Sequence, residues 1–107
     1  MTKMTRNQRN IRVNVLSDNN EPCGLPVTLV GREAQTLRKL IDAGERGISS
    51  LDHPGIRLAH YCMKIRRAGI TVETVKTPQR GEYAGWFGVY KLRSHIAVIE
   101  DNTRATA

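Results

Sequence analysis

Basic side chains between residues 57 and 80 give this sequence its most distinctive chemistry. The segment holds six lysines and arginines against a single acid, Glu73. Lysine and arginine neutralise phosphates, and arginine can also donate two hydrogen bonds to the edge of a guanine. We therefore expect a polyanion as the partner of this segment. Its basic residues are Arg57, Lys64, Arg66, Arg67, Lys76 and Arg80.

The charge of the rest of the chain has a pattern of its own. The 107 residues carry a net charge of +7. Residues 1–12 hold four bases and no acid, whereas residues 13–56 hold six acids against four bases. Two basic blocks separated by a mildly acidic one are typical of a surface that binds nucleic acid. A basic balance also serves solubility alone, so charge by itself does not decide the function.

The sequence lacks the residue patterns of an enzyme or of a metal site. Its carboxylates are dispersed, no nucleophile motif appears, and no glycine-rich phosphate loop precedes a helix. Two cysteines, Cys23 and Cys62, lie far apart, and the three histidines are scattered, which predicts neither a disulfide framework nor a zinc site. We therefore expect a protein that is not an enzyme, with no catalytic residue, no cofactor and no metal.

The sequence contains neither a predicted membrane-spanning segment nor a predicted secretion signal. No apolar run approaches the length that spans a bilayer, and the polar, basic residues 1–10 lack the apolar centre of a secretion signal. We expect no membrane partner and a cytoplasmic location, in association with the nucleoid if the partner is DNA.

The hydrophobic pattern predicts one α+β domain over residues 11–100. Residues 1–10 are expected to form a flexible basic arm and residues 101–107 a disordered tail. Alternation of apolar residues predicts a β-hairpin over 11–30. A helix over 31–44 is predicted by the spacing of Ala34, Leu37, Leu40 and Ile41, which puts them on one face.

A second helix and a second hairpin are predicted in the following half. The helix covers 56–68 and ends at Gly69. Residues 70–75 and 86–92 have the composition of strands. Proline, glycine and small residues predict a loop over 77–85 between them. Residues 95–99 either extend this sheet or pack beside it.

The second helix has one apolar and one basic side. At about 100° per residue, Leu58, Cys62 and Ile65 share one sector. The opposite sector holds His60, Lys64 and Arg67, flanked by Ile56, Arg57 and Met63. A helix of this kind can enter the major groove of DNA. The alternative is an ordinary solvated helix face.

This order of elements resembles the winged-helix family, a variant of helix-turn-helix, and most of all its small bacterial and phage members. Three segments of residues 31–94 carry the resemblance: GREAQTLRKLIDAGERGIS, DHPGIRLAHYCMKIRRAGI and VETVKTPQRGEYAGWFGVYKLRS. The resemblance implies a recognition helix over 56–68 and a basic wing over 76–85. The chain departs from the family pattern because residues 49–55 leave about one turn for the usual middle helix. The DNA contacts implied by the resemblance are Arg57, His60, Lys64 and Arg67, with wing support from Lys76 and Arg80.

Three hypotheses for function follow. The first is a protein that binds double-stranded DNA, as a transcription regulator or as an accessory factor in phage-type DNA transactions. A homodimer is left open, because small winged-helix monomers often need a second subunit for affinity. The second is a module that binds a protein partner through Tyr83, Trp86 and the wing. The third, binding of single-stranded nucleic acid or of RNA, is disfavoured by the low aromatic content of 5%.

Overall fold

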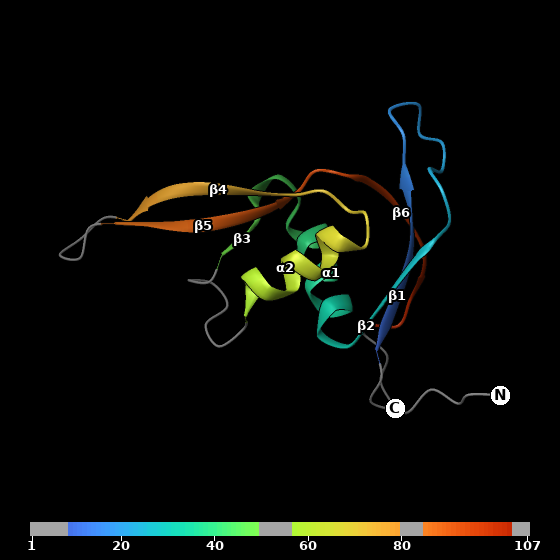
Figure 1. The fold of residues 1–107 in the computed structure, drawn as a ribbon, viewed down its shortest axis with the longest axis horizontal. Coiled ribbons are helices and arrows are strands. Elements are labelled where there is room, and N and C mark those ends of the chain that lie inside the picture. The colour runs from blue at the N-terminus through green and yellow to red at the C-terminus, as the bar shows by residue number, and fades with distance from the viewer. Residues whose placement is uncertain (1–8, 50–56, 80–84, 104–107) are drawn as a thin grey trace.

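The computed structural model describes residues 9–49, 57–79 and 85–103. Within them, two helices lie between two antiparallel sheets of three strands each (Figure 1). One sheet combines the N-terminal hairpin with the last strand, and the other is a long hairpin with a short third strand. The predicted α+β class and both predicted hairpins are confirmed.

The two helices follow the predicted apolar faces. Helix α1 covers Gly31–Ala43 and is followed by the 3-10 turn η1, Gly44–Arg46. Helix α2 covers Leu58–Arg67, so it begins two residues later than predicted. Gly69 follows the C-cap residue Ala68 with a φ of 102°, and the N–H groups of Gly69 and Ile70 donate back to the carbonyls of Arg66 and Ile65. Because an L side chain rarely adopts that φ, glycine is the residue suited to this helix end.

The N-terminal sheet has β1, Asn10–Leu16, as its central strand. The strands β2, Val27–Val30, and β6, His95–Asp101, pair with its two sides. Residues 95–99 were expected to extend the sheet of the second hairpin or to pack beside it, but they pair with β1 of the N-terminal hairpin instead. A bulge sets Ile99 out of register, because Val13 pairs with Val98 while Arg12 pairs with Glu100.

The second sheet has the order β3-β5-β4, with β3 at Ile48–Ser49, β4 at Val72–Gln79 and β5 at Gly85–Leu92. The predicted loop over 77–85 was wrong in extent, because Thr77 pairs with Phe87 and Pro78 with Trp86. Proline is tolerated here because β4 is an edge strand, where one side of the backbone needs no partner. The connection itself, residues 80–84, lies outside the described residues. Of residues 49–55, where a middle helix of about one turn was expected, Ser49 belongs to β3 and the rest also lies outside the described residues.

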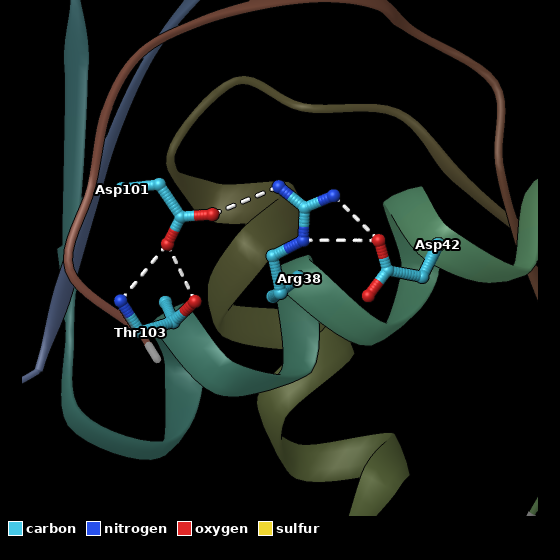
Figure 2. Close-up of polar contacts among 4 residues, drawn as sticks. All are labelled: Arg38, Asp42, Asp101 and Thr103. Carbon is cyan, nitrogen blue, oxygen red and sulfur yellow. Dashed lines mark hydrogen bonds and ion pairs between the residues drawn. The ribbon is translucent and has the colours of Figure 1, made fainter. Parts of the chain in front are cut away.

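The predicted flexible arm over residues 1–10 and the predicted disordered tail over residues 101–107 were both too long. Asn10 begins β1, and the guanidinium of Arg9 donates to the carbonyl of Thr103 at 3.0 Å. The carboxylate of Asp101 accepts hydrogen bonds from the hydroxyl and N–H of Thr103 and from Arg38, which also pairs with Asp42 (Figure 2). Residues 101–103 are thereby tied to α1, whereas residues 1–8 and 104–107 lie outside the described part.

One cluster of buried apolar side chains connects the helices with both sheets. Burial of these groups is the main source of stability in a chain of this size. Its members are Ile11, Val13, Leu29, Ala34, Leu37, Leu40, Ile48, Leu58, Cys62, Ile65, Ile70 and Val72. The partly buried Tyr90 and Leu92 of β5 pack against it.

Candidate nucleic-acid interface

Helix α2 is amphipathic in the way that the sequence predicts. Leu58, Cys62 and Ile65 are buried against the core. Burial raises the pKa of the Cys62 thiol to about 11, against a smaller lowering by the charge of Arg66. This thiol is therefore protonated at neutral pH and serves as a small apolar core group.

Of the four residues predicted to contact DNA from this helix, His60, Lys64 and Arg67 lie opposite its buried side. Arg57 precedes the first turn and is exposed, as are Lys64 and Arg67. His60 is half-buried, and its ring meets the ring of Tyr61 edge-on at a centroid distance of 5.1 Å. Arg57 and Arg67 form no ion pair with the part of the chain that the structure describes. Their guanidinium groups are therefore available to a partner.

Lys64 has an acidic neighbour that the sequence does not reveal. Its Nζ lies 3.5 Å from Oε1 of Glu33 in α1, and its side chain remains 42% exposed. A solvent-exposed pair of this kind contributes little stability, so a phosphate can compete with the carboxylate. Sequence spacing offers no signal for this pair, because the two residues belong to different helices.

Arg66 belongs to the basic segment, but its role differs from that of its neighbours. Its Nε donates to the carbonyl of Val72 at 2.8 Å, and its Nη2 donates to the hydroxyl of Thr74 at 2.7 Å. Both acceptors belong to β4. Arg66 therefore fixes the hairpin β4–β5 against the helix, and the basic face of α2 consists of the other cations.

The single acid within residues 57–80 does not neutralise α2. Arg93 binds the carboxylate of Glu73 at 2.6 Å and that of Glu45 at 3.2 Å. Glu73 is on β4 and Glu45 is in η1, so these pairs hold the base of the hairpin to the turn after α1. Among the ion pairs of the described residues, the one with Glu33 alone reduces the basic character of α2.

The residues predicted on the wing are only partly described. Lys76 is exposed, but it lies within strand β4, opposite Gly88, and not on a loop as predicted. Arg80 and Tyr83 lie outside the described residues, as does the side chain of Trp86. The described strands of this hairpin, β4 and β5, extend well away from the helices (Figure 1).

The elements α1, β3, α2, β4 and β5 all lie within a segment that matches a known family. The family model, described as a winged helix domain, matches residues 26–102. The chain belongs to this family. Searches of curated proteins and of solved structures gave no match.

The winged helix domain of this chain has an added strand. Strand β1 lies outside the matched residues, although it is the central strand of its sheet and carries the fully buried Ile11 and Val13. Winged helix domains are in general DNA-binding modules without enzymatic activity. In the described part of this one, no helix is long and apolar enough to cross a membrane, and no three potential metal ligands cluster.

Proposed function

We propose that this protein binds double-stranded DNA, with α2 as the recognition helix in the major groove and the hairpin β4–β5 beside it. The observation that carries the proposal is the exposed basic face of α2, opposite its buried Leu58, Cys62 and Ile65. Arg57, His60, Lys64 and Arg67 are the proposed contacts on the helix. A helix anchored on one side and basic on the other suits the width of the major groove.

The hairpin supports the same proposal. Lys76 projects from β4, and Arg66 holds that strand to the helix, so a duplex seated on α2 would lie beside the hairpin. Lys76 and Arg80 are the proposed contacts to the phosphate backbone. Regulation of transcription, or a phage-type DNA transaction, is the proposed biological role, and nucleoid association would follow from it.

The test is the salt dependence of duplex binding. The double variant Lys64→Ala/Arg67→Ala is compared with Arg12→Ala/Arg46→Ala, which removes the same charge from exposed positions on β1 and η1. Fluorescence anisotropy with a labelled duplex is recorded from about 50 to about 200 mM salt. Each phosphate contact adds about 0.9 to the magnitude of the slope of log affinity against log salt concentration. The variant Lys64→Ala/Arg67→Ala should therefore have a slope that is shallower by about 1.8.

An equal change in both double variants, or none in either, would overturn α2 as the contact element. The alternative of a protein-binding module predicts a different pattern. In that case the protein is not retained on duplex DNA at moderate salt, and it co-purifies with a protein from nuclease-treated lysate. Light scattering of the free and DNA-bound protein tests whether a homodimer forms.

A further inference from the structure

One row of side chains runs along the exposed side of α2. Ala59, Met63 and Arg67 follow each other at intervals of four residues, which places them in line on the helix surface. All three are exposed, and Met63 is 39% exposed. The other large apolar side chains exposed in the described residues belong to β2, to β6 or to the loop before β2, and not to α2: Leu25, Val30, Val98 and Ile99.

In each of the two neighbouring rows, one basic side chain has a partner on another element. On one side, Arg66 is hydrogen-bonded to β4. On the other, Lys64 is paired with Glu33 of α1. The row between them is exposed, and Met63 at its centre is an apolar side chain with basic residues in both neighbouring rows.

The major groove offers one apolar group to such a side chain. The C5-methyl group of thymine projects into the groove, whereas the other base edges present hydrogen-bond donors and acceptors. Methionine is unbranched and polarizable, so it adapts to an apolar contact whose position varies slightly. An alanine one turn before it leaves room for the base edge.

We infer that Met63, with Ala59, contacts thymine methyl groups and gives the protein a preference for thymine beneath the centre of α2. Arg67, one turn further on, contacts the neighbouring guanine edge or phosphate. The inference rests on the proposed function, since it assigns a base preference to the same helix.

The test compares two DNA polymers that differ only in methyl groups. Poly(dA-dT) has a thymine methyl group in the major groove at every base pair. Wherever the protein binds along this polymer, a methyl group therefore lies near Met63. Poly(dA-dU) has no such methyl groups. The native protein should bind poly(dA-dT) more tightly, by about fourfold for each methyl group that it covers. In Met63→Ala the ratio of the two affinities should fall towards one, and Met63→Leu should retain most of it.

The control variant is Leu25→Ala, which truncates a more exposed apolar residue on the loop between β1 and β2. It should keep the native ratio. A polymer with 5-bromouracil should restore tight binding, because bromine is close to a methyl group in size.

The outcomes separate this inference from the proposed function. Salt-dependent binding to both polymers, with the same ratio in the native protein and in Met63→Ala, overturns the role of Met63 and leaves DNA binding in place. Failure of the native protein to bind either polymer, or any duplex at low salt, overturns the proposed function itself.

Discussion

The guanidinium of Arg66, in the last turn of α2, donates a hydrogen bond of 2.7 Å to the hydroxyl of Thr74 on β4. A second bond from the same guanidinium reaches the carbonyl of Val72. Helix and hairpin are therefore joined by a rigid, planar group that spans the tight turn at Gly69. The neighbouring Arg67 has no such bond with the described residues and points outward.

Removing the hydroxyl of Thr74 should loosen the hairpin without changing the charge of the protein. Thr74→Val leaves the bond to Val72, so the free energy of unfolding should fall by no more than about 1 kcal/mol. Hydrogen exchange at the amides of β4 should become faster. Thr71→Val, at an exposed hydroxyl just before the strand, should change neither quantity. Equal effects of the two variants would contradict a linking role for Arg66.

A methyl group added at Gly47 should destabilise the fold strongly. The φ of Gly47 is 71°, and a Cβ there would lie 2.7 Å from the carbonyl oxygen of Tyr90 and 2.8 Å from Cγ1 of Val89. Strain at positive φ and displacement of β5 together predict a loss of about 2 to 4 kcal/mol for Gly47→Ala in urea unfolding.

The matched control is Gly24→Ala. Gly24 has a similar φ of 74°, but no atom lies within 4 Å of the position that a Cβ would take there. The cost should be limited to the backbone strain, about 1 to 2 kcal/mol. Equal losses at the two glycines would show that β3 and β5 do not approach closely at Gly47.

The free energy of unfolding at acid pH should depend on the carboxylate of Asp101. Burial raises the pKa of this carboxyl, but hydrogen bonds from Thr103 and Arg38 outweigh it and leave the pKa below its ordinary value of 3.8. A lowered pKa in the folded state stabilises the fold above the unfolded pKa, and this contribution is lost as the pH falls through the folded value.

Asp101→Asn should therefore be less stable than the native protein at neutral pH, and the difference should shrink as the pH falls below about 4. Urea unfolding at a series of pH values measures this difference. Asp18→Asn, at an exposed turn residue, removes the same charge as a control. A difference that stays constant down to the acid limit would contradict the role of the carboxylate.

The two cysteines should differ sharply in reactivity. Cys23 is exposed, whereas Cys62 is fully buried and its pKa is raised to about 11. At mildly alkaline pH a thiol reagent should label Cys23 rapidly and Cys62 only as fast as the domain opens. Cys23→Ser should abolish the rapid phase alone. Rapid labelling of both thiols would be incompatible with the packing of α2 against the core.

Local periodicity predicted most of the fold. The apolar faces of α1 and α2 were correct because each helix buries residues spaced by three and four. The placement of β6 was not predictable, since the composition of residues 95–99 does not indicate which sheet they join. The extent of β4 was underestimated because Pro78 suggests a loop, while an edge strand accepts it.

The candidate site could be predicted only in part, because some of its side chains have partners that are distant in the sequence. The sequence indicated which residues of α2 face away from the core, because that follows from the helical period alone. It did not indicate that Glu33 approaches Lys64 or that Arg66 bonds to β4, because these contacts depend on how separate elements are oriented. The six proposed DNA contacts remain predictions for the binding experiments.

The pairing of β1 with β6 also constrains the order in which this protein can be completed. The central strand of the N-terminal sheet is synthesised first, yet one of its two partners contains almost the last described residues, with Val13 opposite Val98 (Figure 1). Nearly the whole domain must leave the ribosome before β6 can pair with β1. Contacts so distant along the chain slow folding. The strand that carries Ile11 and Val13 therefore lacks one of its two partner strands until synthesis of the domain is nearly finished.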